Sequence, residues 1–153
     1  MRDNYKVEKQ EVDVVLTLTD GTSADAKVFL APHSKVHGGI QTFDELLEEA
    51  SYFLPLKVAE DRFVLAGKAG LAAICTEKAN ERELQFCTRV TASLRVTGLG
   101  ELVGEIIVPE SHEHFRVSDY LNDSDNAWVR FEQGTHVYWV SKMAIMELHL
   151  ETI

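Results

Sequence analysis

The chain has 153 residues, of which 45% are hydrophobic and 26% are charged, and its formal net charge is −10 at pH 7. This length fits one ordinary domain or two small ones, and the apolar content supports a packed core and excludes compositional disorder. The negative charge disfavours a broad contact with nucleic acid or with an anionic membrane, because both contacts depend on many Lys and Arg side chains.

The cysteines and the apolar runs narrow the protein class further. Cys75 and Cys87 lack C-x-x-C spacing, so we interpret them as small buried residues rather than a redox pair. Residues 1–6 are polar and do not form the apolar part of a signal peptide. No apolar run approaches the roughly 20 residues that a membrane-spanning helix needs. We therefore expect a cytoplasmic protein that does not contact membranes.

The pattern of the first half predicts β-strands before and after one short helix. Apolar residues alternate from Glu11 to Leu30 with Asp20-Gly21 between the two runs, which predicts a β-hairpin. Thr42 followed three residues later by Glu45 is a capping box and predicts a short helix at 43–50. Pro55 indicates an edge strand or a bulge. The strands predicted after the helix are 52–58, 62–66 and 71–75.

The second half repeats this order after a charged linker at 76–83. Apolar and polar residues alternate more regularly over 84–96 than elsewhere in the chain, which predicts a strand. Gly98-Leu99-Gly100 predicts a turn before a second strand at 102–108. A polar loop at 109–115 precedes a turn in which Ser118 is the predicted helix N-cap. The last predicted strands include 128–131 and the run from 137 to 148.

The order, pattern and spacing of the two halves indicate an internal duplication. Residues 63–74 match residues 137–148 without a gap, which places Lys68 opposite Lys142, 74 positions later. Most of the length difference falls in the loop before the helical turn, where insertions are tolerated. The predicted repeats are 11–75 and 84–150. A five-strand unit of this size closes most easily as a small antiparallel β-barrel.

Both repeats resemble the Sm-like (LSm/Hfq-type) barrel, and more closely uncharacterised bacterial proteins with duplicated Sm-like domains. In the first repeat, Gly21, Ala26 and Val28 fit the start of the first Sm motif, and 43–48 fits its end with Glu48 in place of Asn. In the second repeat, the fitting segments are 104–106 and 117–122, with Ser118 in place of Asp. The second Sm motif corresponds to 66–71 and 140–145, without its Arg-Gly pair.

The resemblance implies two tandem Sm/SH3-like barrels, mainly antiparallel, with a short helix in the first. It also implies an RNA-binding alternative, because the Asp, Asn and Arg positions of RNA-binding Sm proteins line the nucleotide pocket. The first repeat keeps only Asp44 of these and the second keeps only Asn122. The net charge and the absent Arg-Gly pair make nucleic acid the less favoured partner.

Motifs for enzymatic chemistry are weak. His112 and His114 form a His-x-His pair that could chelate a metal with His33, His37 or His136, but solvated loop histidines are the favoured interpretation. The sequence contains no nucleophile elbow, phosphate loop or dinucleotide fingerprint. We therefore predict no catalytic residue, cofactor or metal, and keep a small-ligand or metal-dependent function at the repeat interface as a third hypothesis.

The sequence favours a non-enzymatic binding or assembly module that acts through barrel edges, with a protein partner or a second copy forming a homodimer or small ring. The apolar run of Val137, Tyr138 and Trp139 is the predicted self-association surface. The remaining candidate residues are polar and are predicted to contact a ligand or partner: Asp44, Lys68, Arg116, Asp119, Asn122 and Lys142.

Overall fold

The computed structural model describes most of the chain, and the predictions for His37, for His112 and His114 and for residues 84–86 fall outside the described part. The described residues are 10–34, 39–49, 51–81, 87–109, 116–123 and 125–151.

The first half follows the predicted order of a hairpin, a short helix and three strands. The capping box is confirmed, because the Thr42 hydroxyl accepts a hydrogen bond from the Glu45 backbone N–H and the Glu45 carboxylate accepts one from the Thr42 N–H. Its elements are β1 (Gln10–Leu18), β2 (Ser23–Leu30), α1 (Phe43–Glu48), β3 (Phe53–Val58), β4 (Arg62–Gly67) and β5 (Leu71–Glu77).

The second half has the same sequence of elements, and the helical turn predicted there is the short helix α2. Arg116, not Ser118, is the N-cap of this helix and makes no side-chain capping bond, so the N-cap prediction for Ser118 is wrong. Its elements are β6 (Cys87–Val96), β7 (Gly100–Pro109), α2 (Val117–Asn122), β8 (Trp128–Gln133), β9 (His136–Ser141) and β10 (Ile145–Leu150).

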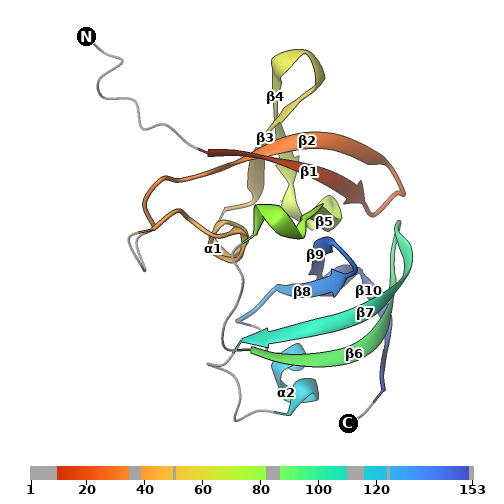
Figure 1. Cartoon of the computed structure of the whole chain (residues 1–153). Coiled ribbons are helices and arrows are strands. Elements are labelled where there is room, and N and C mark those ends of the chain that lie inside the picture. The colour runs from red at the N-terminus through yellow and green to blue at the C-terminus, as the bar shows by residue number, and fades with distance from the viewer. Residues whose placement is uncertain are drawn as a thin grey trace.

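The ten strands found in the described residues belong to one antiparallel sheet in the order β10-β6-β7-β8-β9-β5-β1-β2-β3-β4. The mainly β, antiparallel class is therefore confirmed, but the sheet is open and does not form two closed barrels. The two halves lie one above the other, and the β3–β4 hairpin extends beyond β1 and β2 at the top of the view (Figure 1). The outer strands of the sheet are β4 and β10.

Within this sheet, the two halves have the same internal order, with the fifth strand followed by the first to the fourth. Short 3₁₀ turns at matching positions precede the fifth strand of each half, η3 at Lys68–Gly70 and η6 at Lys142–Ala144. A common ancestor of the two halves stays a prediction. The shared order nevertheless allows each residue of one half to be compared with its counterpart in the other.

Two hydrophobic cores form, and each includes residues from the opposite half. The first core is built on β1, β2, α1 and β3, and it also contains Trp128, Val137 and Trp139 from the second half. The second core is built on β6 to β9, and it also contains Ala72 and Ala73 from β5. The cores therefore depend on the contact between the halves.

Pro55 does not mark an edge strand, as the sequence suggested, because β3 lies between β2 and β4. Proline has no backbone N–H to donate to a ladder, and it is tolerated here because the ladder between β2 and β3 ends before it. The last pair of that ladder is Val28 with Leu56, and Pro55 lies just beyond it. In the second half, where Arg130 replaces proline, the corresponding ladder continues to the pair Ile107 and Arg130.

Among the described residues, no helix has the length and apolar character required to cross a membrane.

A substitution at Gly104 can test how closely β7 and β8 approach each other. A Cβ atom on Gly104 would lie 2.2 Å from the Glu132 carbonyl oxygen, whereas a Cβ on Gly70 meets no atom within 4 Å. We expect Gly104→Ala to lower the free energy of unfolding by about 1–3 kcal/mol and Gly70→Ala to change it by less than about 0.5 kcal/mol. Urea unfolding measures both, and equal effects of the two substitutions would contradict the packing described for β7 and β8.

Candidate functional site

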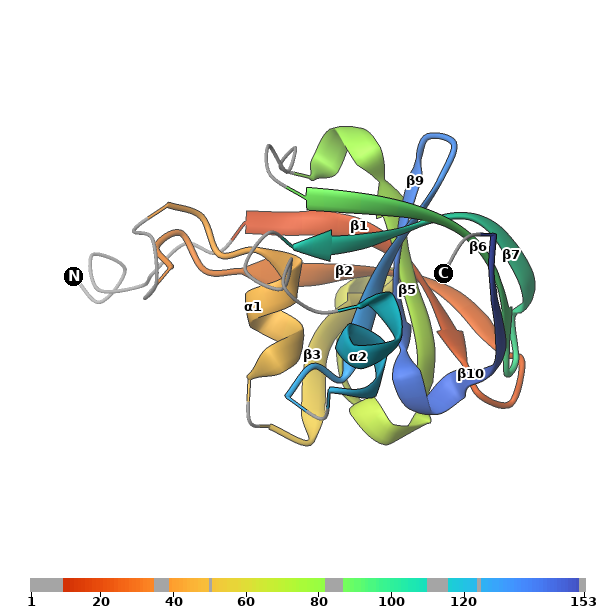
Figure 2. The ribbon, with the colours of Figure 1, turned by 90° about the horizontal axis from the view of Figure 1, so that it is seen from below.

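The contact between the halves is a strand pairing that joins the two five-strand units. β5 and β9 pair antiparallel over five residues, from Ala73 opposite Val140 to Glu77 opposite His136. In the view from below, these two strands run side by side through the middle of the molecule (Figure 2). We call this pairing the junction.

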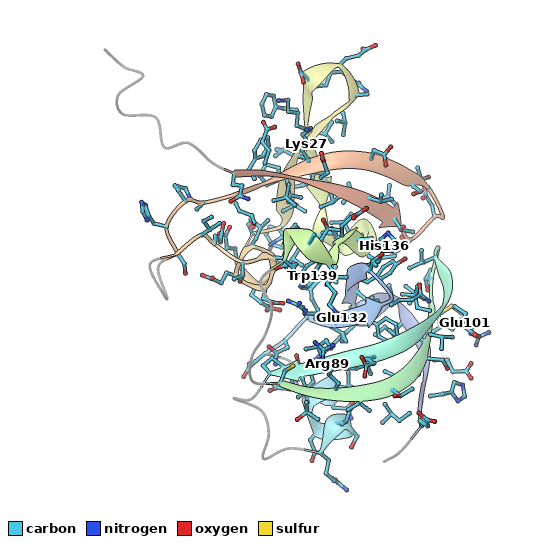
Figure 3. All side chains as sticks on the ribbon, in the orientation of Figure 1. Lys27, Arg89, Glu101, Glu132, His136 and Trp139 are labelled. Atoms are coloured by element: carbon cyan, nitrogen blue, oxygen red, sulfur yellow. The ribbon has the colours of Figure 1, made fainter. Side chains whose placement is uncertain are left out.

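Trp139 is the central side chain of the junction. It is fully buried, its ring stacks on Phe43 of α1 with centroids 4.4 Å apart, and its indole N–H donates a hydrogen bond to Asp44 at 3.0 Å (Figure 3). The guanidinium of Arg130 lies 5.8 Å from the ring centroid, within cation–π distance. Helix α1 of one half is thereby held on β9 of the other.

Asp44 therefore has a partner inside the chain. Loss of water around its carboxylate raises the pKa of Asp44, and the hydrogen bond from Trp139 and the charge of Arg130 only partly oppose this. A second carboxylate of α1 also reaches across the halves, because Glu48 accepts a hydrogen bond from the backbone N–H of Ala127 at 3.3 Å. The acidic face of α1 thus contributes to the junction.

An ion-pair network around the buried Glu132 carboxylate stabilises the same contact. The carboxylate accepts hydrogen bonds from Arg89 at 2.7 Å and Arg130 at 3.2 Å, and Lys78, in the turn that follows β5, lies 3.0 Å away. Arg89 and Glu132 are drawn close together in Figure 3. Burial alone would raise the pKa of Glu132, but its cationic partners outweigh burial and lower the pKa to about 2.

The two matched lysines have equivalent structural roles. The ammonium of Lys68 donates to the carbonyls of Leu47 and Glu49, at 3.3 and 3.0 Å, where α1 ends. The ammonium of Lys142 donates to the carbonyls of Tyr120 and Asp123, at 3.2 and 3.0 Å, where α2 ends. Such bonds satisfy carbonyls that have no partner within the helix. Neither lysine stands free to bind a ligand.

The other polar candidates lie on or next to α2. Arg116 and Asp119 form an exposed ion pair one helical turn apart, at 3.2 Å, and the hydrogen bond from Arg116 lowers the pKa of Asp119. Asn122 is the last residue of α2 and is exposed. The structure therefore separates the six polar candidates into two sets, Asp44 with Lys68 at α1 and the other four at α2, and does not form one pocket from them.

The structure corrects our prediction of a self-association surface at Val137, Tyr138 and Trp139. Val137 and Trp139 are fully buried by the junction, and Tyr138 is half-buried opposite Cys75. These residues face an interface, but the other side of that interface is β5 of the same chain.

The counterpart of β9 in the first half is β4, an outer strand of the sheet. Apart from half-buried Ala66, every residue of β4 is exposed, including Phe63 at 74% and Leu65 at 67%. Phe63 stacks on Phe29 of β2 with ring centroids 5.8 Å apart, so one of its faces is covered. An outer strand with exposed large apolar side chains is a template for pairing with another chain. Our sequence interpretation predicted this strand at 62–66 but did not select it as a candidate surface, although its apolar run resembles that at 136–140.

The opposite outer strand, β10, is the counterpart of β5. It pairs with β6, and its exposed residues include Met146, Glu147 and His149. Glu147 accepts a hydrogen bond from Arg95 and contacts His149, so the exposed surface of β10 is mainly polar. Its remaining residues are half-buried and pack against the second core.

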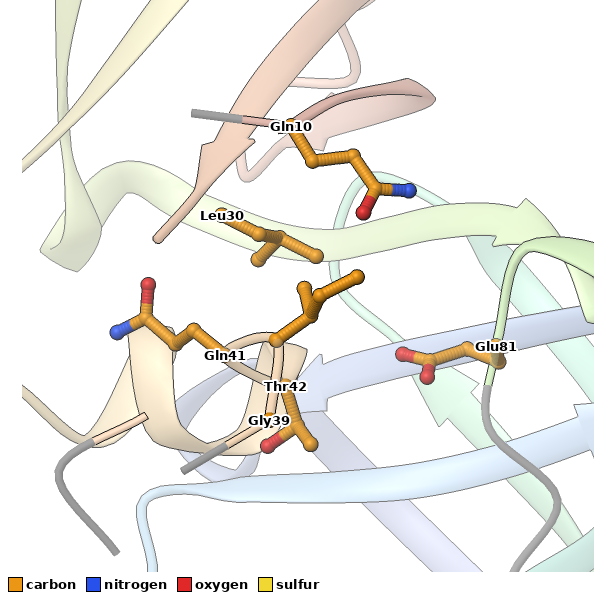
Figure 4. A pocket seen from close by; sticks show the side chains of 7 residues that line it. Gln10, Leu30, Gly39, Gln41, Thr42 and Glu81 are labelled. Carbon is orange, nitrogen blue, oxygen red and sulfur yellow. The ribbon is translucent and has the colours of Figure 1, made fainter. Parts of the chain in front are cut away.

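The cavities provide weaker candidates. One cavity of about 310 Å³ lies between the start of β1 and the loop before α1 (Figure 4). Two of its polar side chains bond within the chain, because Gln41 bonds Ala31 and Glu49 and Thr42 caps α1. Its lining residues are Gln10, Leu30, Gly39, Ile40, Gln41, Thr42 and Glu81.

A larger cleft of about 540 Å³ is lined partly by Asp13, Asp25, Cys75, Glu77 and His136. Nevertheless, in the described part of the chain no three His, Cys, Asp or Glu residues are grouped closely enough to hold a metal ion. The predicted His112 and His114 pair lies outside that part.

The sequence matches no protein-family model, and no curated protein or solved structure is significantly similar to it.

The Glu132 network predicts an acid-sensitive contribution to stability. Because the folded-state pKa of about 2 lies below the ordinary value of 4.5, this contribution is fully present above pH 4.5 and is lost as the pH falls toward 2. At about 1.4 kcal/mol per pKa unit, the loss amounts to about 3 kcal/mol.

Urea unfolding at several pH values measures this contribution. We expect the free energy of unfolding of Glu132→Gln to depend less on pH between 4.5 and 2 than that of the wild type, by about 3 kcal/mol. Glu101→Gln, which removes an exposed carboxylate from β7, is the control. Parallel pH profiles for the wild type and Glu132→Gln would show that the network has no such role.

Proposed function

We propose that this protein is a non-enzymatic protein-binding module that takes up an extended strand along β4. The single observation behind the proposal is the contrast between β4 and β9. Both are the fourth strand of their half, but the free side of β9 is covered by β5, whereas β4 is the last strand of the sheet. Strand addition to an open sheet edge is a general mode of peptide recognition.

The chemistry of β4 supports this binding mode. Its unpaired main-chain groups can form a ladder with an added strand, and Phe63 and Leu65 can bury their exposed side chains against it. Complete burial of such a side chain contributes about 1.5–3 kcal/mol. That gain is partly offset by the loss of translational and rotational freedom on association, so we expect moderate affinity.

The polar contacts favour this proposal over the alternative of RNA binding. An RNA site requires cations available for phosphates, and the ammonium groups of Lys68 and Lys142 are engaged with helix carbonyls. Arg116 pairs with Asp119.

A small-ligand or metal site between the halves has less support. Trp139 and Phe43 fill part of the junction, and the cleft beside Cys75, Glu77 and His136 contains no group of three His, Cys, Asp or Glu residues among the described residues that could hold a metal ion.

The resemblance to Sm-like repeats is part of the proposal at the level of strand order. Each half arranges its strands as 5-1-2-3-4 within an open sheet. We infer two related small β units whose open edges, rather than closed barrels, provide the binding surface.

A synthetic peptide with the sequence of β5, with serine at the position of Cys75 and a fluorescent label, tests strand uptake. β5 is a suitable probe because it already pairs with β9, the counterpart of β4. At a protein concentration that keeps the chain monomeric, we expect the peptide to bind the wild type and Leu65→Asp to weaken binding at least about tenfold, a loss of about 1.4 kcal/mol. Fluorescence anisotropy measures the affinity.

Val103→Asp is the matched control, since Val103 is also an exposed apolar residue but lies on β7 inside the sheet. It should bind the peptide like the wild type. Absence of peptide binding to the wild type, or equal weakening by both substitutions, would refute uptake at β4.

A further inference from the structure

Building on the proposed function, we infer that the strand taken up by β4 is β10 of a second copy of this chain, so that copies join head to tail. The junction within the chain supports this pairing. There, the fourth strand of one half pairs with the fifth strand of the other. The strands left at the two ends of the sheet are again a fourth strand, β4, and a fifth strand, β10. One chain therefore carries both sides of a second junction.

The junction also supplies a register for that pairing. The two halves are offset by 74 residues in this region. When this offset is applied to the β5–β9 pairs, Leu65 lies opposite Leu148 of the second copy and Arg62 lies opposite Glu151. Opposite charges and paired apolar side chains both stabilise directly facing positions. The complete predicted register is Arg62–Glu151, Phe63–Leu150, Val64–His149, Leu65–Leu148 and Ala66–Glu147.

Three residues of the second half indicate which side chains of the first half would become buried in such a contact. Trp128, Val137 and Trp139 lie in the core of the first half and are 7%, 0% and 0% exposed. Their counterparts in the first half are Phe53, Phe63 and Leu65, which are 55%, 74% and 67% exposed. The residues that would enter the second core of a neighbouring copy are thus apolar and exposed.

The second core has a matching open side. Ile145 and Leu148 of β10 and Leu121 of α2 are only half-buried. Their counterparts Leu71, Ile74 and Leu47 are buried in the first core, the first two almost completely, next to Trp139. The second half therefore lacks the cover that β9 gives to the first half, and β4 of another copy has the side chains to provide it.

The contact between copies should be weaker than the junction. Leu65 replaces Trp139, so the ring stacking and the indole hydrogen bond are lost. Ser118 stands at the position that corresponds to Asp44, which accepts that hydrogen bond. A concentration-dependent association of folded chains follows, instead of a permanent dimer. Because the two surfaces differ, the contact is heterologous and joins copies into a ring or an open chain.

The test uses one variant for each side of the contact and needs no unknown ligand. Leu65→Asp changes β4, where the side chain is exposed, so the monomer should stay folded. Leu150→Asp changes β10 at the position opposite Phe63, and circular dichroism checks that it folds. Sedimentation equilibrium should give a mass that rises with concentration for the wild type and a monomer for each variant. An equimolar mixture of the two variants should form dimers, because each retains one intact side.

A covalent version tests the register. In a background with Cys75→Ala and Cys87→Ala, the pair Val64→Cys with His149→Cys should form disulfide-linked dimers and higher species under mild oxidation. The control pair, Val64→Cys with Glu147→Cys, displaces the second cysteine by two residues along β10 and should link at least about tenfold more slowly, because disulfides require Cα atoms roughly 4.4–6.8 Å apart.

Three results would overturn head-to-tail pairing. They are a wild type that is monomeric at all concentrations, a mixture of variants that stays monomeric, and equal linking of both cysteine pairs. If the β5 peptide still bound along β4 in those cases, strand uptake would stand and only the second copy would be refuted. Loss of peptide binding would refute the proposed function itself.

Discussion

The pairing of β5 with β9 is the contact on which the rest of the structure depends. It joins two five-strand units into one sheet, and it carries Val137 and Trp139 into the core of the first half and Ala72 and Ala73 into the core of the second. Neither core is complete without the other half. The stacking of Phe43 on Trp139 and the bond from Trp139 to Asp44 then fix helix α1 against the junction.

The ion pairs at matching positions differ between the halves, although the strand order is the same. In the second half, Arg89 of the first strand pairs with Glu132 of the third strand at 2.7 Å. In the first half, the counterpart pair is Glu11 with Lys57 at 3.1 Å, with the signs reversed. Only the second pair is extended across the junction, by Lys78. The same backbone positions thus carry a surface pair in one half and a buried network in the other.

The sequence predicted those features that depend on local pattern. Alternation located β1, β2, β6 and β7, and the Thr42 and Glu45 capping box located α1. The helical turn at α2 was also predicted, but with Ser118 as its N-cap, because arginine is not a capping residue and Arg116 makes no side-chain cap. The sequence could not decide which apolar strand is covered, because Val137 to Val140 and Phe63 to Ala66 have the same period and differ only in their partner strands. Pairing between distant strands is not encoded in local periodicity.

The roles of the candidate polar residues could not be decided from the sequence for a related reason. Lys68 and Lys142 were recognised as matching positions, but a matched lysine fits a ligand site and a helix cap equally well from sequence alone. Only the positions of the α1 and α2 carbonyls distinguish the two. Likewise, Asp44 was expected at a binding pocket, whereas its partner, Trp139, lies 95 residues away in the sequence.

In our proposal, β4 is an open strand edge that another strand completes, as β5 completes β9. Amide hydrogen exchange measured at several protein concentrations tests this directly, because pairing protects backbone N–H groups. We expect the amides of β9 to be protected at every concentration. The amides of residues 62–66 and 147–150 that are not bonded to β3 or β6 within the chain should become protected together as the concentration rises. If protection of these outward amides of β4 did not change with concentration, or appeared without that of β10, pairing of β4 with another strand would be contradicted.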